Sequence, residues 1–207
     1  MRKIGGISNE MGYGAFIVGG VVRDLILGVR NLDLDIVIEG DAIRLAGALS
    51  RSLNGTLVVH KKFGTATLVT KDALKIDLAT ARKETYKDPA AFPTVEFSSL
   101  EDDLSRRDFT INAMAVSINK KDFGRLVDLF GGVDDLKRGL IRVMHDASFI
   151  DDPTRILRAV RFGYRLGFAI EKHTEKLIEK AMDENIFAKL SPRRIRKEMT
   201  LILKGIL

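Results

Sequence analysis

Residues 15–38 read AFIVGGVVRDLILGVRNLDLDIVI, and this stretch decides the fold of the first part of the chain. A short apolar run over residues 15–18 predicts a strand, and Gly19-Gly20 closes it. Residues 21–27 have the spacing of a helix, and residues 34–38 predict a second strand. The chain is therefore expected to run strand, glycine turn, helix and strand.

Two carboxylates stand at the start of the second predicted strand. Side chains of a strand alternate between faces, so Asp33 and Asp35 share one face while Leu34 packs on the other. Carboxylates ~6–7 Å apart at their Cα atoms repel unless a cation lies between them, and such hard ligands favour Mg²⁺. Asp77 interrupts a strand predicted over residues 74–79 in the same way and is a candidate third carboxylate. By itself, such a pair is also typical of a solvent-exposed strand face.

The glycine turn is a candidate phosphate site. Gly19 and Gly20 let the backbone approach a ligand closely, and Arg23 adds a guanidinium suited to phosphate oxygens. A Gly-Gly pair is more often only a tight turn. Here, however, thirteen residues lead from Gly20 to Asp33, the length of one helix and a return strand. A phosphate site and a metal site can therefore meet at one end of the sheet.

The remaining pattern divides the chain into two parts. We expect an α+β head over residues 1–145 and an all-helical neck over residues 146–207. Residues 65–70 and 74–79 are expected to pair as a hairpin, whereas residues 82–100 have two prolines and no clear period and are expected to form a loop. The other predicted elements are a helix over 42–53, a strand over 56–59, and helices over 154–166, 171–182 and 192–203.

Composition excludes several classes of protein. A hydrophobic content of 45% is enough for a sizeable core, which excludes a disordered chain. The chain has no cysteine, hence no disulfide or thiolate site, and its three isolated histidines do not indicate zinc. Neither a signal peptide nor a run of roughly 18 apolar residues is present, so we expect no membrane segment and a cytoplasmic location.

Basic residues gather near the C-terminal end of the chain. Residues 189–204 hold six basic side chains against one acid, Glu198. This patch suits a polyanion, nucleic acid before membrane, although a solvated helix face explains it equally well. The apolar residues 201–203 and 206–207 predict that a further helical domain or a second subunit packs on this end.

Residues 106–112 read RRDFTIN and combine two cations, a carboxylate and an amide. Arg107 and Asn112 are candidates to face the phosphate and sugar of a nucleotide, while Asp108 is also a candidate helix N-cap. A second basic group follows at Arg155, Arg158, Arg161 and Arg165, which fall within an arc of ~120° on one helix. Acids at i±4 are nearly absent, so this stripe is expected to need an external anion, although most arginine stripes are solvated faces.

An adjacent carboxylate and guanidinium can read a nucleobase. A carboxylate only accepts hydrogen bonds and a guanidinium only donates them. Cytosine and adenine present an amino donor beside a ring-nitrogen acceptor, whereas guanine and uracil present an acceptor beside an N–H donor. Asp152 and Arg155 therefore match C and A, and a wrong base leaves buried polar groups unsatisfied at ~1–3 kcal/mol each.

The chain resembles the class II tRNA nucleotidyltransferases (CCA-adding enzymes) and their bacterial poly(A) polymerase relatives. The resemblance covers roughly residues 15–170. It implies a head of the DNA polymerase beta superfamily, with a mixed sheet and flanking helices, and then a helical neck. The family normally continues into body and tail domains that hold tRNA, which are not among these 207 residues. Six segments carry the resemblance in order: VGGVVRDLILG, LDLDIVI, KIDLATARKETY, LSRRDFTINAMAV, LVDLFGGVDDLKRGLIR and DDPTRILRAVRFGYRLGF.

The resemblance also implies roles for individual residues. Asp33 and Asp35 would hold Mg²⁺, with Asp77 as the third catalytic carboxylate of the superfamily. Residues 82–100 resemble the flexible segment linked to adding A, and Val127 to Arg142 resembles the head–neck hinge. Asp151 departs from the family, where glutamate is common, and a shorter carboxylate could change how the reading pair is braced. The nucleotide-binding positions would be Gly19, Gly20 and Arg23 at the triphosphate, Arg107, Asp108 and Asn112 at phosphate and ribose, and Asp152, Arg155, Arg158 and Arg161 at the base or the phosphates.

The function implied is template-independent transfer of C, A or both from CTP or ATP to the 3′ end of tRNA, with release of pyrophosphate. Three alternatives stay open: addition of CC alone or A alone, a poly(A) polymerase on the same head, and a non-catalytic nucleotide- or RNA-binding module. Retention of both Asp33 and Asp35 argues against the last of these.

Overall fold

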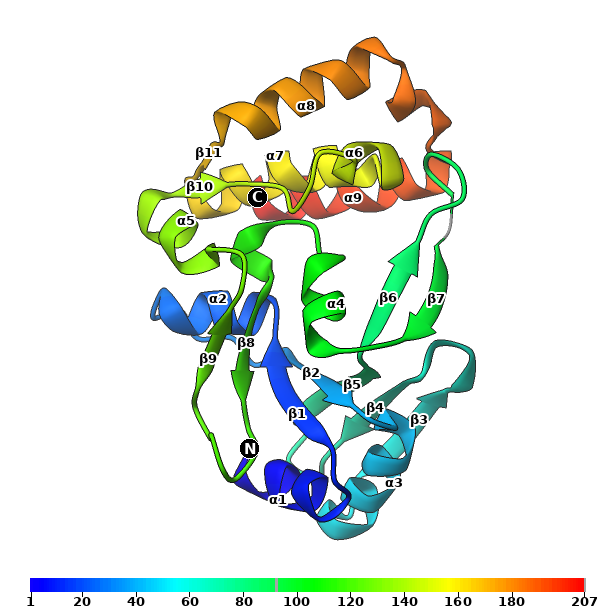
Figure 1. Ribbon diagram of the computed structural model, residues 1–207, viewed down its shortest axis with the longest axis vertical. Coiled ribbons are helices and arrows are strands. Elements are labelled where there is room, and N and C mark those ends of the chain that lie inside the picture. The colour runs from blue at the N-terminus through cyan, green and yellow to red at the C-terminus, as the bar shows by residue number, and fades with distance from the viewer. Residues whose placement is uncertain (92, 207) are drawn as a thin grey trace. The chain divides into compact units, whose positions relative to one another are not determined.

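The structure, a computed structural model, describes residues 1–91 and 93–206 (Figure 1). The chain packs as two compact units. These units are defined by packing, so the domain boundary predicted after residue 145 remains a prediction. The first unit comprises Met1–Lys83, Val95–Arg106 and Asn112–Phe130, and the second comprises Glu84–Thr94, Arg107–Ile111 and Gly131–Leu207.

The first unit is built on a seven-stranded sheet in the order β3-β4-β5-β2-β1-β8-β9. Among the strands that the structure describes in this sheet, only the neighbours β2 and β5 are parallel. This mixed sheet confirms the predicted α+β class of the head. The strands are β1 (Gly14–Val18), β2 (Leu34–Glu39), β3 (Thr56–His60), β4 (Thr65–Val69), β5 (Lys75–Thr80), β8 (Met114–Ser117) and β9 (Leu126–Asp128).

Both faces of the sheet are covered, because the central strands alternate between two apolar clusters. Ile36 and Ile38 of β2 share one buried cluster with Leu45. Val37 belongs to a second buried cluster, with Leu104. Helices α1 (Arg2–Glu10) and α3 (Ala42–Leu53) therefore pack on one face, and α4 (Leu100–Ser105) packs on the other (Figure 1).

Most predicted elements of the first unit are confirmed. The helix expected over residues 21–27 is α2 (Gly20–Ile26), and the expected hairpin is formed by β4 and β5. Helix α3 has the predicted bounds because Asp41 caps its start and Asn54, in the left-handed conformation, ends it. Helix α1 was not predicted, because two adjacent glycines weaken its helical signal, and neither were the short elements α4, β8 and β9.

The prediction of a loop over residues 82–100 is wrong. Strands β6 (Arg82–Thr85) and β7 (Thr94–Phe97) pair as a separate two-stranded sheet, and α4 begins at Leu100. None of the residues of these two strands is fully buried, so their sequence lacks the apolar alternation of a half-buried strand. An ion pair at 2.9 Å joins the two strands, between Lys83 and Glu96.

The second unit is mainly helical, as predicted. Its long helices are α7 (Thr154–Leu166), α8 (Lys172–Asp183) and α9 (Pro192–Ile206), which follow the expected ranges closely. The neck predicted over residues 146–207 is not entirely helical, because it contains β11 (Ala169–Ile170), which pairs in parallel with β10 (Leu140–Ile141). The remaining elements are α5 (Gly132–Arg138), α6 (Ser148–Asp151) and the 3₁₀ turns η1 (Lys61–Phe63), η2 (Thr110–Asn112) and η3 (Ile186–Lys189). Of these, η1 and the last residue of η2 belong to the first unit.

The predicted partner surface at the end of the chain is only partly described. Leu201 and Leu203 expose apolar side chains, whereas the side chain of Ile206 and all of Leu207 lie outside the described residues. Packing of another domain or subunit on this end remains a prediction. Within the described ranges, the structure contains no helix with the length and apolar character needed to cross a membrane.

Candidate active site

The predicted carboxylates lie near the start of the central parallel strands. Asp35 of β2 pairs with Asp77 of β5, so the two side chains share a face of the sheet. The neighbours of Asp35, Leu34 and Ile36, belong to the apolar cluster on the opposite face. Asp33 directly precedes β2, and both it and Asp35 are exposed. The alternation predicted from the sequence is therefore present from Leu34 to Ile36, and the placement of Asp33 on the same face as Asp35 remains a prediction.

Lys75 lies within electrostatic range of all three carboxylates. It forms an ion pair with Asp77, which also accepts a hydrogen bond from Thr67. The bond to Asp77 raises the pKa of Lys75 against the effect of burial, and the charges of Asp77, Asp33 and Asp35 raise it further. Burial raises the pKa of Asp77, but the bonds from Lys75 and Thr67 outweigh it and hold that pKa below its ordinary value. The negative charges therefore gather at one place on the sheet.

The donor set fits a divalent cation that also binds substrate. Within residues 1–91 and 93–206, no group of three or more Asp, Glu, His or Cys side chains is arranged to hold a metal ion. Asp33 and Asp35 have exposed side chains, and Asp77 is bound to Lys75. Mg²⁺ keeps several waters and takes phosphate oxygens as ligands, so it does not require a complete cage of protein ligands.

The glycine turn adjoins the start of β2. Ile17 pairs with Ile36 in antiparallel strands, so β1 ends beside the point where β2 begins. Gly19 follows β1 with a φ of +75°, a conformation that favours glycine, and precedes the first residue of α2. A Cβ at Gly20 would lie 3.4 Å from Nη2 of Arg23, so the turn rests on this guanidinium. The turn and the carboxylates therefore share one end of the sheet.

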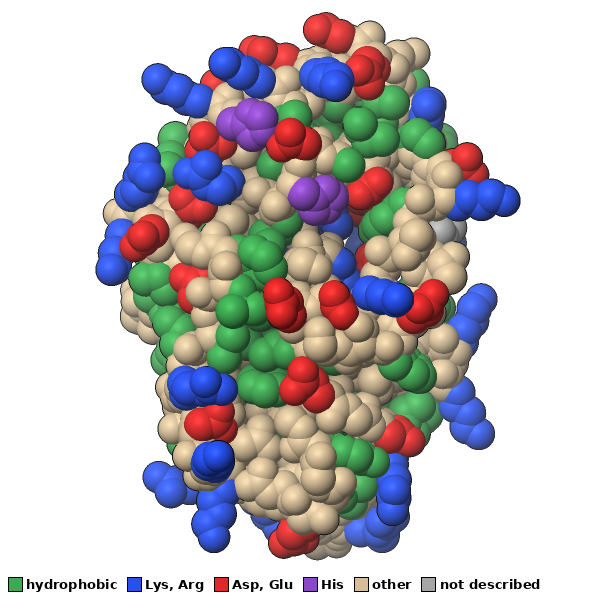
Figure 2. All heavy atoms as spheres, in the orientation of Figure 1, with side chains coloured by type: hydrophobic (Ala, Val, Ile, Leu, Met, Phe, Trp, Pro, Cys, Tyr) green, Lys and Arg blue, Asp and Glu red, His purple; other side chains and the backbone are tan. Residues whose placement is uncertain are grey.

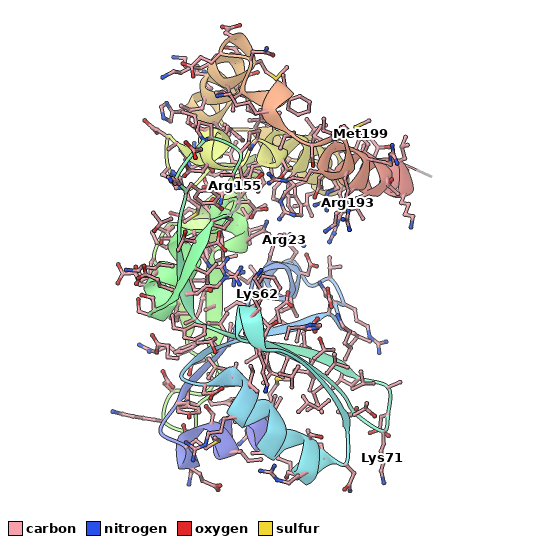
Figure 3. All side chains as sticks on the ribbon, turned by 90° about the vertical axis from the view of Figure 1, so that its right-hand side faces the viewer. Arg23, Lys62, Lys71, Arg155, Arg193 and Met199 are labelled. Atoms are coloured by element: carbon pink, nitrogen blue, oxygen red, sulfur yellow. The ribbon has the colours of Figure 1, made fainter. Side chains whose placement is uncertain are left out.

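Arg23 lies buried beneath the turn, on α2 (Figure 3). Its guanidinium binds the carboxylate of Asp24 at 2.6 Å and donates to Oδ1 of Asn112 at 2.7 Å. Asp24 also accepts a hydrogen bond at 2.7 Å from Asn31. Two predicted nucleotide-binding residues, Arg23 and Asn112, are thus brought together from 89 positions apart. Direct contact of either one with a nucleotide remains a prediction.

In the second unit, distant acids neutralise much of the arginine stripe. Nε of Arg158 donates to Asp108 at 2.8 Å, and Arg161 pairs with Glu198 of α9 at 3.1 Å. Asp108 and Glu198 are both buried. The prediction that the stripe needs an external anion is wrong for these two arginines. The acids were missed because they lie 50 and 37 positions away, beyond any local pattern.

The segment Arg107–Ile111 belongs to the second unit, although the residues on either side of it belong to the first. Its first residue is half-buried. One oxygen of Asp108 accepts the next backbone N–H at 2.9 Å and the other binds Arg158, while its role as a helix N-cap remains a prediction. Thr110 donates to the buried Asp135 at 2.7 Å. The side chains of Asp108 and Thr110 therefore anchor the segment in the second unit.

The predicted base-reading pair lies at the start of α7. Oδ1 of Asp152 accepts from the N–H of Thr154 at 2.9 Å and from Arg194 at 2.6 Å. Arg155 is buried, and it donates to Oγ of Ser148 at 2.6 Å (Figure 3). Neighbouring side chains thus hold both members of the pair. A fixed acceptor and a fixed donor are what discrimination between base edges requires.

Tyr86 belongs to the same neighbourhood, although its sequence context indicated no role. Its hydroxyl donates to Glu84 at 2.9 Å. Burial raises the pKa of Tyr86, and the charge of Glu84 raises it further, while Arg155 lowers it. In His145, burial has the opposite effect and lowers the pKa, and the positive charge of Arg155 lowers it further. A tyrosine and a histidine therefore both lie within the electrostatic range of Arg155.

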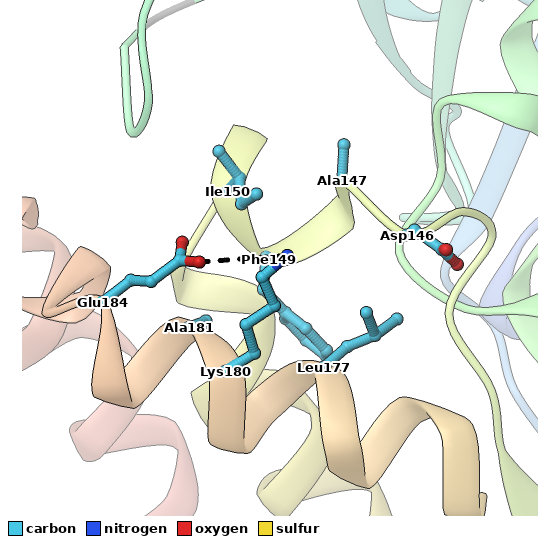
Figure 4. A pocket seen from close by; sticks show the side chains of 8 residues that line it. All are labelled: Asp146, Ala147, Phe149, Ile150, Leu177, Lys180, Ala181 and Glu184. Carbon is cyan, nitrogen blue, oxygen red and sulfur yellow. Dashed lines mark ion pairs between the residues drawn. The ribbon is translucent and has the colours of Figure 1, made fainter.

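A cavity of about 260 Å³ lies in the second unit between α6 and α8 (Figure 4). Phe149 and Ala181 give it an apolar wall, and Lys180 and Glu184 form an ion pair at 3.8 Å beside it. None of its lining residues is a predicted site residue. Figure 2 shows acidic and basic side chains interspersed on the face drawn there, so that face offers no patch of a single charge.

Residues 15–142 match the family of the poly(A) polymerase head domain. The chain belongs to this family. Among curated relatives, it is 48% identical over 204 residues to an A-adding tRNA nucleotidyltransferase of Geobacter sulfurreducens. That match covers 99% of the chain and 23% of the relative. The family resemblance expected from the sequence is therefore confirmed.

Two solved structures are similar to nearly the whole chain. The apo form of a CCA-adding enzyme has a TM-score of 0.95 at 51% identity, covering 98% of this chain and 48% of that one. The CCA-adding enzyme of Thermotoga maritima, solved with tRNA, has a TM-score of 0.87 at 49% identity, covering 98% and 46%. The chain thus spans about half the length of these two solved relatives.

Replacing Arg23 should destabilise the protein. Arg23→Met leaves the carboxylate of Asp24 buried without its cation, which costs about 3–5 kcal/mol of unfolding free energy. Urea unfolding followed by circular dichroism measures the loss. Arg30→Met, at an exposed arginine of the same unit, is the control and should leave the unfolding free energy nearly unchanged. Equal stability of the two variants would contradict the buried link.

Proposed function

We propose that this chain carries the catalytic part of an enzyme that adds C, A or both, from CTP or ATP, to the 3′ end of tRNA and releases pyrophosphate. The observation that carries this proposal is the grouping of Asp33, Asp35 and Asp77 beside the glycine turn. Membership of the poly(A) polymerase head family and similarity to named tRNA nucleotidyltransferases support it.

Asp33 and Asp35 would hold Mg²⁺, with Asp77 as the third carboxylate. Bound there, the metal supplies positive charge for the phosphate oxygens and for the attacking hydroxyl. Asp77 would contribute only after it releases Lys75, its ion-pair partner in this structure. The residues proposed to bind the rest of the nucleotide are Gly19, Gly20, Arg23 and Arg107 at the phosphates and Asp108 and Asn112 near the ribose.

In the second unit, Asp152 and Arg155 would read the base. Their acceptor and donor match the amino group and ring nitrogen of C and A and mismatch G and U. Arg158 and Arg161 are already bound to Asp108 and Glu198, so their proposed role is to support α7 rather than to meet phosphate directly.

The reaction products distinguish the alternatives. A tRNA that ends at the discriminator base gains two nucleotides from CTP alone if CC is added, and a tRNA that ends in CC gains one A if A is added. A long tail from ATP indicates a poly(A) polymerase, and nucleotide binding without incorporation indicates a non-catalytic module. The relative from Geobacter sulfurreducens favours addition of A. A cytoplasmic location remains a prediction.

Replacing either strand carboxylate tests the proposed metal site. Asp33→Asn and Asp35→Asn should each lower incorporation by about 10³-fold or more, because the charge stabilisation that the metal gives is worth several powers of ten. Both side chains are exposed, so the melting temperature should change little. Asp72→Asn, at an exposed carboxylate in the β4–β5 turn, is the control and should retain full activity. Retained turnover in either Asp33→Asn or Asp35→Asn would overturn the metal site.

Helix α9 divides its charged side chains between two faces. Arg194 and Glu198 form ion pairs with Asp152 and with α7. Four further cations of α9 are exposed, make no ion pair with any described residue, and fall within an arc of ~100° on the helix. We propose that this stripe binds the phosphate backbone of tRNA. Its members are Arg193 (labelled in Figure 3), Arg196, Lys197 and Lys204.

Removing two cations of this stripe should weaken tRNA binding and make it less sensitive to salt. The double variant Arg193→Gln with Lys197→Gln should make the negative slope of log affinity against log salt less steep by about two, since each phosphate contact contributes about one. Fluorescence anisotropy with labelled tRNA measures the slope. The matched control is Lys172→Gln with Lys176→Gln, an exposed pair of the same spacing on α8. Identical slopes for both variants would contradict the RNA-binding role.

A further inference from the structure

The two oxygens of the Asp152 carboxylate have different surroundings. Oδ1 accepts hydrogen bonds from the backbone and the hydroxyl of Thr154 and binds Arg194 at 2.6 Å. All the hydrogen bonds that the described residues donate to this carboxylate reach Oδ1, and none reaches Oδ2. Asp152 is about one quarter exposed at its side chain. The carboxylate therefore has one oxygen fixed by the protein and one oxygen left to accept from a ligand.

Arg194 binds two separate segments of the second unit. Its Nη2 meets Asp152, and its Nη1 donates to the backbone carbonyl of Ala90 at 3.0 Å. Ala90 is itself fixed, because its N–H donates to the carbonyl of Ile150 at 3.1 Å and its φ is +62°. The planar guanidinium is thus held at two of its nitrogens. Its position in turn fixes the position of Oδ1.

Arg194 restrains a rotation of the Asp152 carboxylate that the bonds from Thr154 alone do not prevent. The bonds from Thr154 reach Oδ1 from the residue's own turn at the start of α7. Arg194 reaches the same oxygen from α9, which lies 42 positions further along the chain. Two directions of approach define the plane of the carboxylate better than one. The direction in which Oδ2 accepts is then set by α9.

We propose that Arg194 is a positioning residue for base selection: by holding Oδ1 of Asp152, it orients Oδ2 to accept the amino group of C or A. This inference rests on the proposed function, in which Asp152 reads the base. It assigns a role in nucleotide choice to a residue of α9, outside the predicted base-reading pair.

The test compares nucleotide choice in three variants. The values of kcat/KM for CTP, ATP, GTP and UTP are measured with tRNA for wild type, Arg194→Met, Asp152→Ala and the double variant. Arg194→Met should lower the preference for the better of CTP and ATP over GTP and UTP by about 10-fold. Arg138→Met, at an exposed arginine of the same unit, is the control and should keep the wild-type preference.

The double variant shows whether Arg194 acts through Asp152. If it does, Arg194→Met should change the preference no further in a chain that already carries Asp152→Ala. An equal effect in both backgrounds would overturn the inference. So would an Arg194→Met protein that loses activity with all four nucleotides by the same factor, which is the result of a purely structural role.

The nucleotide preference of the wild-type protein distinguishes a failure of this inference from a failure of the proposed function on which it rests. A wild-type protein that does not prefer C or A contradicts the proposed function itself. A wild-type protein that has the preference, together with an Arg194→Met variant that retains it, contradicts only the role of Arg194.

Discussion

The candidate site depends on the parallel pairing of β2 with β5. Ile36 and Ile38 of β2 are buried with Leu78 of β5 in one cluster, and full burial of each such side chain contributes about 1.5–3 kcal/mol. A shift of either strand by one residue would turn these side chains to the opposite face. The core therefore fixes the register, and the register places Asp35 beside Asp77. A cluster of like charges is maintained on this face because apolar burial on the other face stabilises it.

In the second unit, ion pairs rather than apolar burial hold the proposed base-reading residues in place. Glu198 of α9 binds Arg161 of α7, and Arg194 of α9 binds Asp152. These contacts join α9 to the residues at and after the start of α7, and they use the charges on one face of α9. The cations on its other face are left exposed. One helix can therefore stabilise the base-reading end of α7 and also present a surface suited to RNA phosphates.

The sequence was sufficient where structure follows from neighbouring residues. Helix α3 is capped at its start by Asp41, α7 ends at the left-handed Gly167, and both have a regular apolar period. The alternation around Asp35 is a property of the strand itself. The sequence was insufficient where partners come from far along the chain. The bond from Arg23 to Asn112 and the pair of Arg161 with Glu198 depend on tertiary packing and leave no local pattern. Strands β6 and β7 were missed for another reason, since exposed strands lack the apolar alternation on which prediction relies.

A crystal structure with Mn²⁺ and a non-hydrolysable CTP analogue tests most directly whether the sheet builds a metal site. Anomalous scattering locates the manganese without reference to the protein. The register of β2 predicts a manganese peak within about 2.0–2.3 Å of a carboxylate oxygen from both Asp33 and Asp35, with phosphate oxygens of the analogue as further ligands. Manganese bound elsewhere, or a triphosphate bound away from these two carboxylates, would contradict the site.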